Sequence, residues 1–409
     1  MESASRTDSD QRLGQTASSG IVQAVEQTTR SFLEFFAGAG MVRAGLGASW
    51  QCLFANDIDP KKGTSYVQNW GKDDFHLGDV AELKAEDLPR SADLAWASFP
   101  CQDLSLAGSG AGLNGKRSGT YWPFRNLMRG LARKGHAPTL IVLENVRGAI
   151  TSHGGQDFVA IATSISEIGY QLGALVVDAV DFLPQSRARL FIIAVSRNVS
   201  VSGPLISPTH DAKWCPASLL AVVDRLPATV RSNWCWWQLP SPQPRQQVLG
   251  DLIDDEPIGI SWHSNYETAR LLGMMTDINR AKVDRAGACG HRTVGTVYRR
   301  TRSNGRGGRI QRAEIRFDGV AGCLRTPQGG SSRQTVMVVN GDEIRSRLLS
   351  PREAARLMGL EDSYKLPKNY NDAYRLAGDG VAVPVVRHLS QYLLEPLLAK
   401  GASALRAAA

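Results

Sequence analysis

The chain has 409 residues, a formal net charge of +8 and a pI of about 9.3. Its hydrophobic fraction of 43% supplies a substantial core and excludes a chain that is disordered throughout. No apolar run is long enough to span a bilayer and residues 1–30 lack the apolar centre of a signal peptide, so we expect a cytoplasmic protein with no membrane partner. The six cysteines lack CxxC spacing, which argues against a metal site, and the basic charge favours a polyanionic partner.

Strand-like and helix-like segments alternate through the first half of the chain. Residues 1–30, rich in Ser, Thr and Gln, predict a mobile tail. Apolar runs predict strands at 32–36, 52–55, 94–99, 140–143, 174–180 and 190–195. Helices are predicted at 41–46, from residue 60, and over 122–134 and 157–168. This order predicts an α/β fold with a mostly parallel sheet covered by helices on both faces.

The pattern changes near residue 200. Pro, Trp and turn residues become frequent, and no alternation of strand and helix is visible before about residue 345, which predicts a second region of irregular architecture. Its tryptophans at 214, 234, 236 and 237 favour packing over base stacking. Helices are predicted again from 350 to about 359 and over 385–400. We expect a tail over 1–30, a first domain over 31–200, a smaller domain over 201–345, and a segment over 346–400 that completes the first domain.

Glycines and carboxylates stand at the ends of the first three strands. Gly38 and Gly40 follow the first strand and would let the backbone approach a cofactor, although the full GxGxxG fingerprint is absent and a plain turn is equally compatible. Asp57 ends the second strand, where a carboxylate accepts from ribose hydroxyls or simply caps the next helix. Asp79 follows a third strand end, at Gly78, which lies between the predicted strands at 52–55 and 94–99. The three ends together favour a cofactor crevice.

A thiol and a carboxylic acid follow the next two strands. Cys101 would lie at the rim of the sheet, although most such cysteines are inert packing. Glu144 ends the neighbouring strand, and its alternative role is a buried glutamate paired with an arginine. Strand alternation places Gln185, Arg187 and Arg189 on one face, where the arginines form a clamp for an anion or a base or are merely solvated.

Arginines crowd the stretch from His291 to Arg316. They are Arg292, Arg299, Arg300, Arg302, Arg306, Arg309, Arg312 and Arg316. Arginine interleaved with glycine, with little acidic compensation, favours contact with phosphates and guanines over the alternative of a solvated loop.

In chain order, these pieces resemble the cytosine-C5 DNA methyltransferase family. The matching segments are FAGAG, NDID, GDV, FPCQDLS, ENV, QSRAR, SPREAARLMG and AGDGVAVPVV, from Phe32 to about Val386. The resemblance implies a Rossmann-like S-adenosylmethionine methyltransferase fold with a smaller target-recognition domain inserted before the last two motifs. It also implies double-stranded DNA as the partner. We expect a monomer, bound to the nucleoid through DNA and working alone or with a cognate restriction or phage-defence system.

The resemblance assigns roles to the residues at the strand ends. Cys101 would attack C6 of a flipped-out cytosine, and Glu144 would hold and protonate N3. Arg189 would assist at O2, with Arg187 alongside. The implied S-adenosylmethionine contacts are Phe36, Gly38, Gly40, Asp57, Ile58, Asp79, Val80, Pro100, Asn145 and Val381. The implied contacts to the base and the DNA are Phe99, Ser105, Arg117, Val146, Gln185, Arg299, Arg300, Arg302, Arg306 and Arg309.

The chain departs from the family pattern at several places. Asp379-Gly380 stands where Asn-Ser or Asn-Gly is usual, and Ile58 stands where an aromatic residue often stacks on adenine. Asp57 is shorter than the usual Glu, and Arg117 is offset by about one residue from the family's loop arginine. The first three departures affect the expected affinity for the cofactor, not the reaction.

Two further functions are compatible with these motifs. One is RNA cytosine-C5 methylation of the Dnmt2-like type, which the sizeable recognition region disfavours. The other is a catalytically inactive DNA-binding module, which the intact Cys101, Glu144 and Arg189 disfavour.

Overall fold

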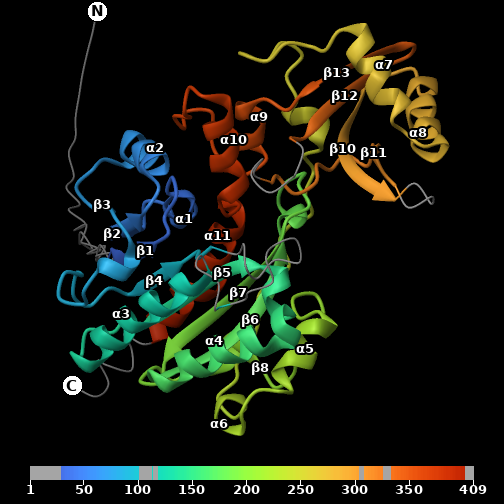
Figure 1. Cartoon of the computed structure of the whole chain (residues 1–409). Helices are drawn as coiled ribbons and strands as arrows, with labels where there is room; N and C mark the ends of the chain where they lie inside the picture. Colours follow the sequence, from blue (N-terminus) through green and yellow to red (C-terminus); the bar gives the residue numbers. More distant parts are fainter. Residues whose placement is uncertain (1–28, 101–112, 114–117, 304–307, 326–332, 401–409) are drawn as a thin grey trace, which may run out of the picture.

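The computed structural model describes residues 29–100, 113, 118–303, 308–325 and 333–400. Residues 1–28 of the predicted tail and the residues Cys101, Ser105, Arg117 and Arg306 lie outside these ranges, whereas Arg30, placed in the tail by the prediction, begins the first strand. In Figure 1 the described chain forms two units, one built on a large sheet and one on a small sheet. None of the helices in the described ranges is long and apolar enough to cross a membrane.

A seven-stranded sheet forms the larger unit. Its strands are β1 (Arg30–Phe35), β2 (Trp50–Asp57), β3 (Phe75–Leu77), β4 (Leu94–Ala97), β5 (Leu140–Val146), β6 (Tyr170–Asp178) and β7 (Ala188–Ser196). The strand order is β3-β2-β1-β4-β5-β7-β6, and β7 runs antiparallel to both of its neighbours while the other pairs are parallel. The mostly parallel sheet is thus confirmed, and all six predicted strands are found with shifted ends: β4 and β6, for example, stop two residues before their predicted ends.

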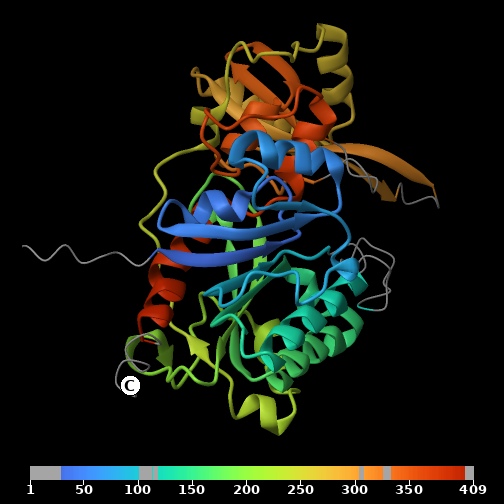
Figure 2. The same cartoon turned by 90° about the vertical axis from the view of Figure 1, so that its left-hand side faces the viewer.

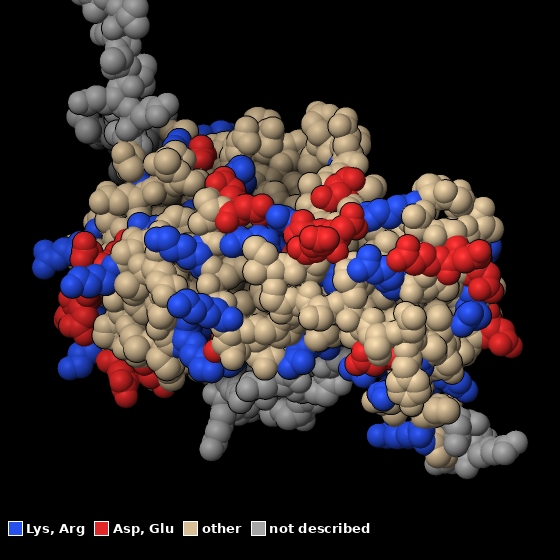
Figure 3. Space-filling view, turned by 90° about the horizontal axis from the view of Figure 1, so that it is seen from above, with Lys and Arg blue, Asp and Glu red and all other residues tan. Residues whose placement is uncertain are grey.

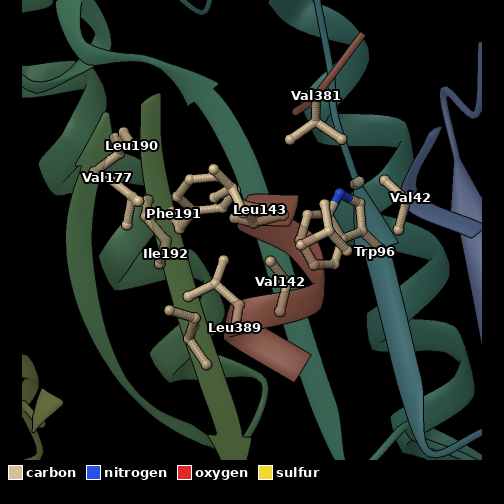
Figure 4. Packing of buried hydrophobic residues seen from close by; sticks show 14 of the residues in the cluster. Val42, Trp96, Val142, Leu143, Val177, Leu190, Phe191, Ile192, Val381 and Leu389 are labelled. Atoms are coloured by element: carbon tan, nitrogen blue, oxygen red, sulfur yellow. The ribbon is translucent and has the colours of Figure 1, made fainter. Parts of the chain in front are cut away.

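Helices cover both faces of this sheet (Figure 2). They include α1 (Met41–Leu46), α2 (Pro60–Trp70), α3 (Tyr121–Arg133), α4 (Gln156–Glu167) and α11 (Val383–Leu389). Figure 4 shows Leu389 of α11 beside Val142, and Val42 of α1 beside Trp96. On the opposite face, Phe124 of α3 meets Phe35 with ring centroids 5.1 Å apart. The strands carry near-continuous apolar runs because both faces are buried.

The segment from 205 to 239 belongs to the core of the larger unit. It contains β8 (Ile206–Ser207), α5 (Ala217–Val223), α6 (Ala228–Arg231) and β9 (Trp236–Trp237). Trp214 and Trp237 are almost fully buried, and the Trp237 indole donates to the carbonyl of Ile193 on β7 at 3.2 Å. Packing is therefore the role of these two tryptophans, and a segment that the domain prediction places in the smaller unit contacts the large sheet.

The smaller unit is regular, not irregular as predicted. Its sheet has the order β11-β10-β12-β13, all antiparallel, and two helices cover it. The elements are α7 (Asn265–Gly273), α8 (Asp277–Ala288), β10 (Thr293–Ser303), β11 (Arg309–Arg316), β12 (Thr335–Asn340) and β13 (Glu343–Leu348). The outer halves of β10 and β11 are exposed, so their sequence carries no alternation of apolar and polar residues from which a strand could be predicted.

The chain then returns to the larger unit through α9 (Pro351–Arg356) and α10 (Tyr370–Asp379). The predicted helix after residue 350 is confirmed, whereas α10 was not predicted. Two fully buried side chains mark the junction: Arg347 of β13 forms a bidentate ion pair with Glu353 of α9 at 2.6 and 2.8 Å. The last helix begins at Val383, two residues before its predicted start, and includes a π-helical stretch at Ser390–Leu394.

Candidate active site

The turn after β1 is shaped by backbone geometry that glycine favours. Gly38 and Gly40 have φ of +59° and +80°, and a Cβ on Gly40 would lie 2.3 Å from the Trp70 indole nitrogen. A Cβ on Gly38 would meet nothing within 4 Å, so the backbone there faces open space. Phe36 also has positive φ, +58°. An open glycine backbone at the carboxyl end of the first strand fits close approach by a cofactor.

Asp57 ties this turn to the end of β2. Its Oδ2 accepts from the Gly38 N–H at 2.8 Å and its Oδ1 from the Asp59 N–H at 2.8 Å. Each carboxylate oxygen keeps a second lone pair for a ribose hydroxyl. Asp79 caps the turn after β3 by accepting from the Ala81 N–H at 2.9 Å. The strand ends therefore carry fixed acceptors at one edge of the sheet.

Apolar residues complete this edge. Ile58 is 64% exposed and presents an aliphatic side chain where adenine could pack, whereas Val80 and Val381 are buried. Together with the open turn and the carboxylates, these residues fit an adenosyl cofactor. Among the described residues, no group of His, Cys, Asp or Glu is arranged to hold a metal ion.

Glu144 and Arg189 meet at the ends of the neighbouring strands β5 and β7. The Arg189 Nε lies 3.2 Å from Glu144 Oε1, and both side chains are largely buried. Burial raises the pKa of Glu144 above its usual value, against the opposing effects of Arg189, Arg187 and a hydrogen bond from Ser98. The pocket thus favours the protonated acid while keeping a cation beside it.

Arg187 is buried and bonded to main-chain carbonyls from two distant segments. Its Nη2 donates to Gly378 O at 2.9 Å and Gly380 O at 2.6 Å, and its Nη1 donates to Leu324 O at 3.2 Å. Burial lowers the pKa of this guanidinium, helped by the nearby charge of Arg189. Arg187 therefore fastens the segment at Leu324 and the turn at Gly378 and Gly380 to the start of β7.

Gln185 has a similar fastening geometry. It is fully buried; its Nε2 donates to Leu357 O at 2.6 Å, and its Oε1 accepts from the Leu324 N–H at 3.2 Å. Arg187 and Arg189 both approach Cys323 Sγ, and Arg189 forms the ion pair with Glu144.

Asn145 fixes the strand end that leads into Cys101. Its Nδ2 donates to Phe99 O at 3.1 Å, and its Oδ1 accepts from the Val146 N–H at 2.9 Å. Phe99 is buried against Tyr121, with ring centroids 5.4 Å apart. The structure thus brings the residue pair before Cys101 next to the strand that carries Glu144.

Cys323 is a thiol in the pocket to which the sequence interpretation assigned no role. Its Sγ lies 3.4 Å from Arg187 Nη1 and 4.0 Å from Arg189 Nη2. Burial raises the pKa of this thiol, but the two arginines outweigh that effect and the net pKa is lowered. The sequence signal for this loop is the glycine before Cys323, because no side chain fits there: a Cβ on Gly322 would lie 1.9 Å from the Tyr298 hydroxyl. This close packing holds the loop against the pocket.

The arginine-rich stretch is a β-hairpin formed by β10 and β11, which projects from the smaller unit (Figures 1 and 2). Arg299, Arg300, Arg302 and Arg309 are exposed on it. The interpretation that little acidic charge compensates them is wrong. Glu314 pairs with Arg302 at 2.5 Å and with Arg300 at 3.4 Å, and Arg292 and Arg316 pair with Asp255 and Asp318. On the face seen in Figure 3, basic and acidic side chains are likewise interspersed.

Comparisons with known proteins agree with this architecture. A family model described as C-5 cytosine-specific DNA methylase matches residues 30–395. The chain is 24% identical to the type II methyltransferase M.HhaI of Haemophilus parahaemolyticus over 364 residues, which cover 88% of this chain and 92% of that protein. It is 26% identical to the type II methyltransferase M.DsaV of Dactylococcopsis salina over 374 residues, which cover 90% of this chain and 87% of that protein. The crystal structure of S. pombe Dnmt2 methyltransferase shares the fold, with a TM-score of 0.56 at 18% identity, covering 90% of this chain and 99% of that one.

These matches confirm the Rossmann-like fold, the enzyme class and S-adenosylmethionine as the cofactor that the glycine turn and the acidic strand ends fit. Since the family model spans nearly the whole chain, from the first strand to the last helix, the protein belongs to the C-5 cytosine-specific DNA methylase family and is a DNA cytosine-C5 methyltransferase.

Proposed function

We propose that the chain methylates a flipped-out cytosine of duplex DNA through a transient covalent bond between Cys101 and C6. The observation that carries this proposal is the buried Glu144–Arg189 pair at 3.2 Å, beside the strand end that leads into Cys101. Cytosine C5 is a poor nucleophile until a thiolate adds at C6, and neither atom is accessible inside a stacked duplex. The base must therefore leave the helix and enter this pocket.

The chain's own groups carry each step except the supply of the methyl group, which comes from S-adenosylmethionine as an electrophile. The Cys101 sulfur bonds to C6 while Glu144 gives its proton to N3, so that electron density reaches C5. After C5 has been methylated, it loses its proton to solvent and the C6–S bond breaks, which restores the ring double bond and frees the thiolate. N3 then returns its proton to Glu144. Arg189 steadies O2 and the carboxylate left on Glu144.

Two features of the pocket support this assignment. Burial favours the protonated form of Glu144 that N3 requires. Arg189 and Arg187 place positive charge at the pocket, which would favour the Cys101 thiolate over the thiol. Asn145 would position the Cys101 loop through the Phe99 carbonyl.

We propose that the β10–β11 hairpin is the principal DNA-binding element, through Arg299, Arg300, Arg302, Arg306 and Arg309. Guanidinium groups contact phosphates and the acceptor edge of guanine. The relatives named as type II methyltransferases support a role in restriction-modification or phage defence, beside a cognate nuclease. The chain would act as a monomer.

A mechanism-based substrate tests this proposal. Duplex DNA carrying 5-fluorocytosine, incubated with the full chain and S-adenosylmethionine, should give a covalent adduct, because fluorine at C5 cannot leave as a proton does. Cys101→Ser should give none. An adduct with RNA and none with any duplex DNA would overturn the choice of substrate, and an adduct that persists in Cys101→Ser would overturn the nucleophile.

A further inference from the structure

Four charged residues connect the start of α2 to the end of α10. Lys62 pairs with Asp379 at 2.8 Å, and Arg375 lies 3.5 Å from Asp379 and 3.3 Å from Asp59. We call Asp59, Lys62, Arg375 and Asp379 the α2–α10 clamp. Their side chains are 19 to 33% exposed, so the clamp is only partly shielded from solvent.

One end of the clamp reaches the loop after β2. Asp59 caps α2 by accepting from the Lys61 N–H at 2.9 Å, and its own N–H donates to Asp57. Asp57 in turn accepts from Gly38. The clamp is thus bonded to the two strand ends proposed to contact S-adenosylmethionine, and Ile58 lies between Asp57 and Asp59.

The other end reaches the turn from Gly378 to Val381. Arg187 holds this turn from the opposite side, through the carbonyls of Gly378 and Gly380. Gly380 itself packs so closely that a Cβ would lie 2.1 Å from Met41 Sδ. The turn therefore lies between the clamp and Arg187, and Asp379 is the residue of the turn that pairs with the clamp.

We propose that Asp379 is a positioning residue for the cofactor. Its pairs with Lys62 and Arg375 set the 378–381 turn, and with it Val381, against the loop that carries Asp57 and Ile58. The inference rests on the proposed cofactor contacts of these residues. Because the pairs are partly exposed, the affinity for S-adenosylmethionine depends on ionic strength through the clamp.

Calorimetric titration of the full chain with S-adenosylmethionine, without DNA, measures this affinity directly. Asp379→Asn and Lys62→Met should each raise the Kd by about three- to tenfold, the range that a loss of about 1 kcal/mol gives. The rise should be largest at low salt. The matched control is Lys61→Met, which removes a pair between the same two helices, Lys61 with Asp372 at 2.9 Å, but does not touch the turn. Its Kd should stay unchanged.

A double variant separates positioning from general stability. Lys62→Met combined with Asp379→Asn should raise the Kd little beyond Asp379→Asn alone, because Lys62 then has no ion pair with Asp379 left to lose. In steady-state methylation the single variants should raise KM for S-adenosylmethionine while kcat at saturation changes less than about twofold. A parallel fall of kcat and melting temperature, with fully additive losses of affinity in the double variant, would show a merely structural role.

The outcomes distinguish this inference from the proposed function. If the unaltered chain binds S-adenosylmethionine and Asp379→Asn binds it equally well, the clamp has no positioning role, whatever the methylation assay shows. If Lys61→Met lost as much affinity for S-adenosylmethionine as Asp379→Asn, the positioning role of the clamp would also be overturned. A chain that binds no S-adenosylmethionine would overturn both proposals, whereas a chain that binds it but forms no adduct on DNA would overturn the proposed function alone.

Discussion

Arg189 and Glu144 lie on adjacent antiparallel strands, with Nε and Oε1 3.2 Å apart, and both side chains are largely buried. Two opposing effects act on the pKa of the Glu144 carboxyl: burial raises it and the charge of Arg189 lowers it. Burial is the larger effect, so the pKa is raised. The pair can therefore deliver a proton and stabilise the carboxylate that remains.

Replacing Glu144 with Gln should abolish proton transfer to N3 while keeping the shape of the pocket. We expect kcat to fall by about 10²- to 10⁴-fold, the usual contribution of general acid catalysis. DNA affinity, measured by fluorescence anisotropy, should change less than about threefold because the amide still hydrogen-bonds. Unchanged turnover would show that another group acts as the acid.

Glu34 of β1 should make the stability of the fold depend on pH. Its carboxyl is buried, and burial raises its pKa to about 8 from 4.5, with Asp57 and Asp74 adding to the rise and Arg43 and the Val42 backbone opposing it. Between pH 4.5 and 8 the folded state keeps this proton and the unfolded state loses it, so the free energy of unfolding falls as pH rises through that window.

Urea unfolding of Glu34→Gln at pH 5.5 and pH 8 measures this effect. From pH 5.5 to pH 8, the free energy of unfolding should fall by at least about 1 kcal/mol less in the variant than in the unaltered chain, because the glutamine side chain cannot ionise. Glu82→Gln, at an exposed position, is the control and should keep the original pH dependence. Identical slopes for Glu34→Gln and the unaltered chain would contradict the prediction.

The junction between the units should depend on the buried pair of Arg347 and Glu353. Glu353→Ala leaves a buried guanidinium without its partner, and we expect a loss of about 3–5 kcal/mol in the free energy of unfolding. Breaking the exposed pair of Arg280 and Asp284 with Arg280→Gln should cost less than about 1 kcal/mol. Equal losses in the two variants, measured by urea unfolding, would show that burial of the pair has no special weight.

Glu314 should restrain DNA binding, because it occupies two arginines of the hairpin. Glu314→Gln releases Arg300 and Arg302, so we expect tighter DNA binding and a steeper dependence of log K on log salt concentration. Neutralising both arginines should instead weaken binding and flatten that slope by about 2. Binding curves at several salt concentrations test both, and a slope unaffected by either change would exclude the hairpin from the phosphate contacts.

The sequence predicted the large sheet well because its strands are buried on both faces. The run from Leu140 to Leu143 is wholly apolar for that reason, and the polar residues Glu144 and Asn145 mark where it reaches the edge. The end of a buried strand is therefore visible in the sequence, and so is a candidate site there. The role of each site residue remains a prediction that the proposed experiments test.

Other features depend on contacts that no local pattern reveals. The carbonyl partners of Arg187 lie more than 130 residues away, at Leu324, Gly378 and Gly380, so its burial could not be deduced from its neighbours in sequence. Cys323 gains its electrostatic environment in the same way. The hairpin was misread because arginines on both exposed faces hide the period of two that strands usually show.

The carbonyls that hold Arg187 have a consequence for synthesis of the chain. Gly378 and Gly380 leave the ribosome long after Glu144 and Arg189, yet they fix the arginine on which the pocket rests. A nascent or truncated chain that stops before residue 378 would contain every proposed catalytic residue and still lack an assembled pocket, so it should form no adduct with 5-fluorocytosine DNA. Assembly of the proposed site would then wait for the turn at the end of α10, one of the later parts of the chain to be made.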